Sequence, residues 1–251
     1  MSDLLESSLY SVEQAKRRID EFAEHLVAFR DSNPYREVIE SNEDATYDIY
    51  KIKLVKPLPR PIRGIAFEIV SHLRASLDQA GRATAVAAGQ RGAKTKFPFG
   101  DNAAEVLSRG TGESKHIPKE IFDLMVTFKP YEAGNHPLWA LNKLCNTGKH
   151  DLVVPLPIIA GDSYIDHFEI DSAPRFNWPP RWDSTKNEMI FLILPTGGKA
   201  KYKFQMRMPI AIGKVKGVEG NPALNVFNVI HAEVARCLSV ISEEAIRIGL
   251  G

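Results

Sequence analysis

Of the 251 residues in the chain, 44% are hydrophobic and 25% are charged, which are the proportions of an ordinary globular protein. The 32 basic and 31 acidic residues leave a formal net charge of +1, which argues against a general electrostatic attraction to nucleic acid or to an anionic membrane. The two cysteines, Cys145 and Cys237, are too few for a disulfide-stapled secreted domain of this length, so we expect buried free thiols.

A long amphipathic helix is predicted for residues 3–31, because apolar residues recur there at alternating steps of three and four. Pro34 limits this helix, since the residue before a proline is disfavoured in the helical conformation. The apolar period changes to two over 46–55, which predicts a strand with one buried face. Lys51 and Lys53 fall on its opposite face, which we expect to be solvated.

Three further helices are predicted after this strand. The first covers 62–88 and carries its apolar residues on one side. A glycine-rich loop over 89–117 separates it from a second helix that begins at Pro118, where a missing amide hydrogen costs little. The third helix covers about 137–147 and also opens with a proline.

The stretch 152–212 is predicted to be rich in strands, because several of its segments alternate apolar and polar residues. Pro155 and Pro157 confine its first strand to an edge of a sheet. A final helix follows, and we expect the side chain of Asn221 to cap it and Pro222 to stand at its first position.

This order of elements is typical of an α+β fold, because a consecutive run of strands lies between helices. We predict a helical bundle of about four or five helices with an inserted antiparallel sheet of about four or five strands. We expect a single domain over 1–251, in which the helical part (1–150 and 220–251, with the strand at 46–55) carries a β-rich insertion over 151–213.

Motifs for common chemistry are missing from the sequence. The glycine-rich segments at 89–95 and 110–115 lack the spacing of a Walker-type phosphate loop. The chain has no His-Glu-x-x-His sequence and no paired cysteine motif, so we predict no metal and no cofactor. Cys145 lies five residues before His150, but it follows leucines on a face that should be buried, which favours a structural thiol over a nucleophile.

An arginine and a histidine on one helix can cleave RNA without a metal, because the arginine stabilises phosphate charge and the histidine moves protons. The helix around Arg74 and the segment from Asn146 to His150 each resemble part of this motif in the HEPN superfamily. Gln79 stands where the family has the histidine, and Cys145 stands where it has the arginine. The resemblance implies a metal-independent ribonuclease or a toxin or defence protein, active or catalytically decayed, with RNA as its partner.

Several short segments stand in a characteristic order along most of the chain. They are Leu-Arg-x-x-Leu-Asp (Leu73 to Asp78), Phe97-Pro98, Lys129-Pro130-Tyr131, His136-Pro137-Leu138-Trp139 and Asn146-x-x-Lys149-His150. This order resembles a group of uncharacterised bacterial α+β proteins, in which the first helix ends in Leu-Asp-His, whereas Gln79 follows Asp78 here. The resemblance implies a bacterial, intracellular protein made of one module, and it implies no activity.

We expect the site to lie where the helices at 62–88 and 137–147 meet. Its residues would be Arg74 and His150 as a catalytic pair and, as binding residues, His72, Asp78, Asn142, Asn146 and Lys149. The alternative is structural: Arg74 and Asp78 pair on the helix surface, and Asn146 with Gly148 ends the following helix.

The favoured interpretation is a soluble bacterial protein that binds an unknown ligand or protein partner, or takes part in an assembly, without robust catalysis. The ribonuclease interpretation is the alternative, so whether the protein is an enzyme stays open at this point. The long helices at 3–31 and 222–248 favour a homodimer.

We expect the protein in the cytoplasm, with no membrane partner. The sequence has no continuous apolar run of the roughly 18–20 residues that a membrane span needs. Its first residues, Met1 to Glu6, lack the basic and apolar regions of a signal peptide.

Overall fold

The computed structural model describes residues 3–147, 152–155, 164–176, 182–183, 185–205 and 210–250. The chain divides into two compact units, each assembled from separate stretches of the sequence. Unit 1 consists of Met1–Glu24, Arg60–Val153 and Ile212–Gly251. Unit 2 consists of His25–Pro59 and Val154–Ala211.

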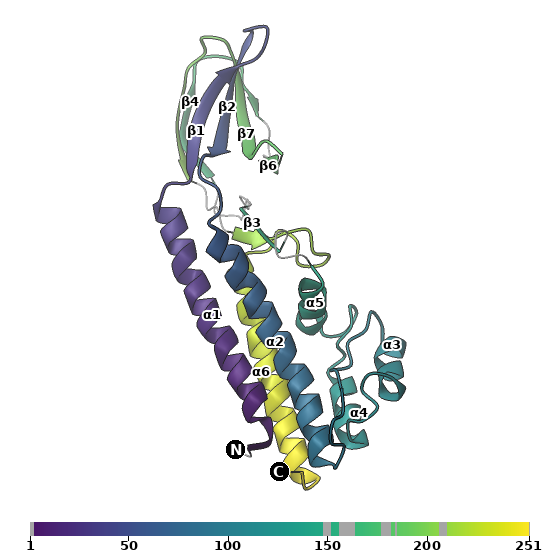
Figure 1. Cartoon of the computed structure of the whole chain (residues 1–251). Helices are drawn as coiled ribbons and strands as arrows, with labels where there is room; N and C mark the ends of the chain where they lie inside the picture. Colours follow the sequence, from purple (N-terminus) through teal and green to yellow (C-terminus); the bar gives the residue numbers. More distant parts are fainter. Residues whose placement is uncertain are drawn as a thin grey trace. The chain divides into compact units, whose positions relative to one another are not determined.

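Unit 1 is mainly helical (Figure 1). It contains most of α1 (Glu6–Asp31) and the helices α2 (Arg60–Ala87), α3 (Ala103–Ser108), α4 (Lys119–Thr127), α5 (His136–Cys145) and α6 (Ala223–Arg247). It also contains two short 3-10 helices, η1 (Asp3–Leu5) and η2 (Arg109–Thr111).

The three long helices of unit 1, α1, α2 and α6, lie side by side in Figure 1 and bury their apolar faces. The ring of Phe22 on α1 meets that of Phe227 on α6 edge to face, with the centroids 5.3 Å apart. Polar contacts also join α1 to α2, because Ser11 donates a hydrogen bond to Gln79 at 2.9 Å. Each helix therefore has the apolar stripe of a core-facing helix.

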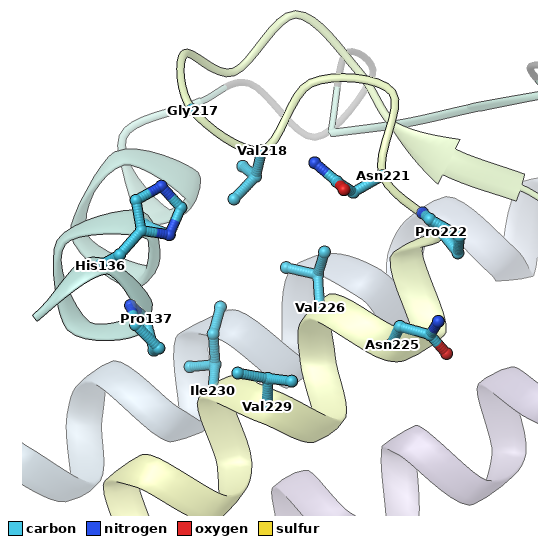
Figure 2. Close-up of a pocket in the computed structure, with 11 residues that line it drawn as sticks. His136, Pro137, Gly217, Val218, Asn221, Pro222, Asn225, Val226, Val229 and Ile230 are labelled. Carbon is cyan, nitrogen blue, oxygen red and sulfur yellow. The ribbon is translucent and has the colours of Figure 1, made fainter. Parts of the chain in front are cut away.

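The shorter helix α5 packs against both α2 and α6. Leu138, Leu141 and Leu144 are fully buried and form its apolar face. The helix therefore extends the core of unit 1 beyond the three long helices and presents its first turn next to the beginning of α6 (Figure 2).

Unit 2 contains an antiparallel sheet with the strand order β1 (Tyr35–Ser41), β2 (Tyr47–Leu54), β7 (Glu188–Pro195) and β5 (Arg175–Phe176), and β6 (Trp182–Asp183) also pairs with β7. A second antiparallel pair consists of β4 (Tyr164–Ile170) and β8 (Ala200–Gln205). Tyr202 of β8 packs on Tyr50 and Phe191 of the sheet, with ring centroids 6.1 and 5.5 Å apart. The second pair therefore contributes to the apolar core of unit 2. The short strands β3 (Val153–Pro155) and β9 (Ile210–Ile212) form a further pair.

The α+β fold class predicted from the sequence is confirmed, with antiparallel strands and a large helical part. The long helices predicted near the beginning, around residue 75 and at the end of the chain correspond to α1, α2 and α6. Their apolar residues recur with the helical period, which is the strongest signal that a sequence gives for secondary structure.

Strand β1 and helix α3 lie where the sequence pattern predicted no element. Strand β1 is an edge strand with charged residues on both faces, which hides its period of two. Helix α3 lies inside the glycine-rich loop, and its first turn is held by reciprocal hydrogen bonds. The side chain of Asn102 accepts from the Glu105 amide, and the Glu105 carboxylate accepts from the Asp101 amide.

The prediction that Lys51 lies on a solvated face of its strand is wrong. Its side chain is 8% exposed, and its Nζ lies 3.2 Å from Oε1 of Glu188, whose side chain is 7% exposed. The same Nζ lies 2.5 Å from Oε2 of Glu40, which also pairs with Lys53. Two lysine and two glutamate side chains thus contact one another. Their opposite charges offset the cost of burying Lys51 and Glu188.

By length and composition, α6 is the one helix among the described residues that could cross a membrane. Phe227, Val234 and Leu238, however, are buried within the protein. In unit 1 the helix contacts α2, α4 and α5. One apolar face of the helix therefore belongs to the core of unit 1.

Candidate functional site

Arg74 lies at the centre of the polar cluster that the sequence predicts between α2 and α5. Its Nε donates a hydrogen bond to Oδ2 of Asp78 at 3.3 Å, and its Nη1 donates to Oδ1 of Asn142 on α5. The guanidinium carbon also lies 3.9 Å from the ring centroid of Phe99, in a cation–π arrangement. Arg74 thus connects its own helix to α5 and to the segment before α3.

Asp78 is the second anchor of this cluster. Its Oδ1 accepts a hydrogen bond from the backbone amide of Phe97 at 2.7 Å, so one carboxylate holds both Arg74 and the chain at Phe97. Burial raises the pKa of Asp78, although the charge of Arg74 and the Phe97 amide act in the opposite direction. The penalty for desolvation therefore exceeds the stabilisation by these partners, as is common for buried ion pairs.

The remaining predicted site residues do not all join this cluster. His72 is half-buried on α2, two residues before Arg74, and therefore lies about 200° around the helix from it. Asn146 is exposed and ends α5, and its amide donates to the carbonyl of Lys143 at 3.2 Å. Lys149 and His150, together with Gly148 of the expected cap, lie outside the described residues. The structure therefore brings together Arg74, Asp78 and Asn142.

The two cysteines have the character of structural thiols. Cys145 donates a hydrogen bond from its Sγ to the carbonyl oxygen of Val70 at 3.3 Å. Burial raises the pKa of Cys145 to about 12, and it raises the pKa of Cys237 to about 12 as well. A thiol of such high pKa is not a nucleophile at neutral pH, because the reactive species is the thiolate.

A pocket lies on another side of α5, within unit 1, and is here called the α5–α6 pocket (Figure 2). Its volume is about 310 Å³. The described residues that line it come from the start of α5, the loop before α6 and the first turns of α6: His136, Pro137, Ala140, Gly217, Val218, Asn221, Pro222, Asn225, Val226, Val229 and Ile230.

The α5 wall of the pocket is fixed by Asn135, the residue before the helix. Its Oδ1 accepts a hydrogen bond from the Leu138 amide at 3.2 Å, which caps α5. Its Nδ2 donates to Glu233 of α6 at 2.5 Å, so the same side chain also attaches the start of α5 to α6. These two bonds determine where His136 stands relative to α6.

The loop from Gly213 to Pro222 forms the upper wall of the pocket. Its ends are joined, because the Ile212 amide donates to the carbonyl of Asn221 at 2.9 Å. Gly217 has a φ of +85°, and a Cβ at this position would lie 2.6 Å from the ring of Trp139 and 3.0 Å from Nε2 of His136. Only glycine fits the loop so closely against α5.

Asn221 does not cap the last helix as the sequence predicts. Pro222 is the N-cap residue of α6, and no side chain caps the helix. The Asn221 side chain makes no hydrogen bond with another described residue. Figure 2 shows its carboxamide extending toward Val218, over the pocket. The prediction of a cap is wrong, and the carboxamide at the rim of the pocket has no partner among the described residues.

The floor and the rim of the pocket differ in chemistry. The floor is apolar and includes the buried residues Ala140 and Ile230, and the buried Val218 of the loop adds to the apolar lining. The rim carries exposed polar residues, among them His136 and Asn221. An apolar cleft of this size with a few polar groups at its edge is typical of a site for a small molecule.

Sequence reasoning missed this pocket. His136 belongs to a segment that carries a family resemblance, but the predicted site lay at the opposite end of α5. The lining residues come from 136–140 and 217–230, which only tertiary packing brings together. No local sequence signal identifies such a site. Within the described residues, no group of three or more His, Cys, Asp or Glu side chains is placed to hold a metal ion.

Comparisons with known proteins identify no relative of the chain. It matches no protein-family model, no curated protein and no solved structure. The chemistry of the described side chains is therefore the basis for inferring a function.

Proposed function

We propose that the protein is a binding module without robust catalysis, and that its site is the α5–α6 pocket. The observation that supports this proposal is the combination of an apolar floor with rim side chains, such as that of Asn221, that make no hydrogen bond with a described residue. Unused hydrogen-bonding groups around an apolar cleft are what a small ligand needs for affinity and orientation.

The contacts of Arg74 favour binding over RNA cleavage. A ribonuclease of the predicted type needs its arginine available to a phosphate in the transition state. Arg74 instead contacts Asp78, Asn142 and the ring of Phe99. We therefore treat this cluster as part of the framework of unit 1 and the α5–α6 pocket as the site.

We also propose that the protein acts in the cytoplasm. Both cysteines are free thiols, as is usual in a reducing compartment. The packing of the apolar helix α6 against α2, α4 and α5 is compatible with the same proposal.

Binding of indole, observed by NMR on protein with labelled valine methyl groups, tests the proposed site. We expect indole to shift the methyl signals of Val218, Val226 and Val229, which line the pocket. Val229→Trp should weaken this binding, because a large side chain at the rim fills the opening. Val229 is 55% exposed, so the change should leave the core intact.

Ile246→Trp is the matched control, because Ile246 is also 55% exposed on α6 but does not belong to the described lining. We expect this variant to bind indole as the unchanged protein does. The proposal is overturned if indole leaves the three valine signals unchanged, or if both tryptophan variants weaken binding equally.

A further inference from the structure

We infer that the α5–α6 pocket selects an uncharged ligand that has a compact apolar body and one amide group. This inference rests on the proposed function, because it specifies the ligand of the same site. It depends on the charges around the pocket, the hydrogen-bonding groups at its rim and its size.

The described lining offers no fixed counter-charge to an ionic ligand. None of its described residues is Asp, Glu, Lys or Arg, and His136 is the one described side chain in it that can ionise. Moving an ionised group from water to an apolar floor without a partner is strongly unfavourable. A carboxylate or an ammonium group would therefore weaken binding here.

Two lysines close to the pocket in the sequence are each paired with a carboxylate. Lys216, next to Gly217, lies 2.8 Å from Glu132. Lys143, one turn beyond Ala140 on α5, lies 2.6 Å from Asp101. Their charges are compensated, so they attract a charged ligand less than an unpaired residue would.

The rim has the groups that pair with an amide. A carboxamide such as that of Asn221 offers a donor and an acceptor side by side. A ligand amide has the complementary acceptor and donor and can satisfy both at once. His136 stands on the opposite side of the pocket, on α5 (Figure 2), where its ring packs on Trp139 with the centroids 5.5 Å apart.

The volume limits the apolar body of the ligand. An apolar cavity of about 150 Å³ holds one benzene molecule. The α5–α6 pocket, at about 310 Å³, therefore has room for two fused rings with a short polar arm. Indole derivatives have this size.

Three probes with one apolar body and different end groups test the inference: indole-3-acetamide, indole-3-acetate and tryptamine, which are neutral, anionic and cationic. We expect the amide to bind at least about tenfold more tightly than either charged probe, as measured by methyl NMR titration of the full chain. Asn221→Ala should remove most of this advantage.

Asn228→Ala is the matched control, because Asn228 is exposed on α6, bonds to the Leu224 carbonyl and is outside the described lining. It should leave all affinities unchanged. The inference is overturned if a charged probe binds as tightly as the amide, or if Asn221→Ala leaves the advantage of the amide intact. In either case the binding of indole would keep the proposed function, whereas failure of indole itself to bind would overturn both.

Discussion

The guanidinium of Arg74 holds together three segments that lie far apart in the sequence. It bonds to Asp78 on its own helix and to Asn142 on α5, and it lies over the ring of Phe99. Asp78 in turn accepts from the Phe97 amide. Removing the arginine would leave a partly buried carboxylate without its cation, which is more costly than losing one surface ion pair.

Arg74→Ala is therefore expected to lower the free energy of unfolding by about 2–3 kcal/mol, which is the usual effect of losing hydrogen bonds to a charged group. Urea unfolding measures this change. Arg82→Ala is the control, because Arg82 is exposed on the same helix, and it should change stability by less than about 0.5 kcal/mol. The structural role is contradicted if Arg74→Ala keeps the stability of the protein but abolishes cleavage of labelled RNA by it.

Three of the short segments that stand in a characteristic order in the sequence contact one another, directly or through neighbouring residues. Asp78 binds the Phe97 amide, Arg74 lies over Phe99, and the Gly100 amide donates to the Pro130 carbonyl at 3.3 Å. These contacts connect the segments around Leu73–Asp78, Phe97-Pro98 and Lys129-Pro130-Tyr131 to one another within unit 1. A sequence pattern of this kind can therefore reflect a framework rather than a reaction.

At the scale of elements, the close contact between the loop Gly213–Pro222 and α5 determines the shape of the pocket. Gly217 and Gly220 both have positive φ, of +85° and +75°. They differ in their surroundings, since a Cβ at Gly217 would meet Trp139 and His136, whereas a Cβ at Gly220 would meet nothing within 4 Å. Substituting each glycine therefore distinguishes the effect of backbone strain, which both positions share, from the effect of a steric clash, which only Gly217 would have.

Gly217→Ala should displace the loop and reduce the affinity for indole, because the new methyl group and the ring of Trp139 cannot occupy their present positions together. Gly220→Ala should cost only the strain of a left-handed residue, about 1–2 kcal/mol, and should leave indole binding unchanged. Methyl NMR titration and urea unfolding of both variants measure these effects. Equal losses of affinity in the two variants would contradict this account of the loop.

The sequence predicts the long elements well and the site poorly. In α1, α2 and α6 the apolar residues repeat over many turns, so the signal accumulates within one segment. The pocket depends on pairs such as His136 and Val218, which no local pattern relates. Asn221 shows the same limit. Asn-Pro is a common helix start, but the conformation of the loop before α6 decides whether the carboxamide caps the helix.

At the scale of the whole molecule, each unit has its own apolar core. In unit 2, Phe191 is fully buried and packs edge to face on Tyr50 and Tyr202. In unit 1, Phe22 and Phe227 have the same arrangement. Every described lining residue of the α5–α6 pocket belongs to unit 1.

Phe191→Ala should therefore destabilise unit 2 by about 3–5 kcal/mol and leave the binding of indole unchanged. Phe22→Ala should have a similar cost in unit 1 and should weaken indole binding. Urea unfolding followed by methyl NMR, with indole titrated at urea concentrations below and within the transition, measures both. Loss of binding in Phe191→Ala at a urea concentration where unit 1 is still folded would contradict the assignment of the site to unit 1 alone.

The position of β1 at the edge of its sheet bears on how the protein behaves in concentrated solution. An unpaired edge can add a strand from another molecule and start aggregation. On β1 the exposed Ile39 lies within a strand that also carries Arg36, Glu37 and Glu40. Neutralising these charged side chains would turn the edge into a site for intermolecular strand pairing, so they protect the protein from self-association through this sheet.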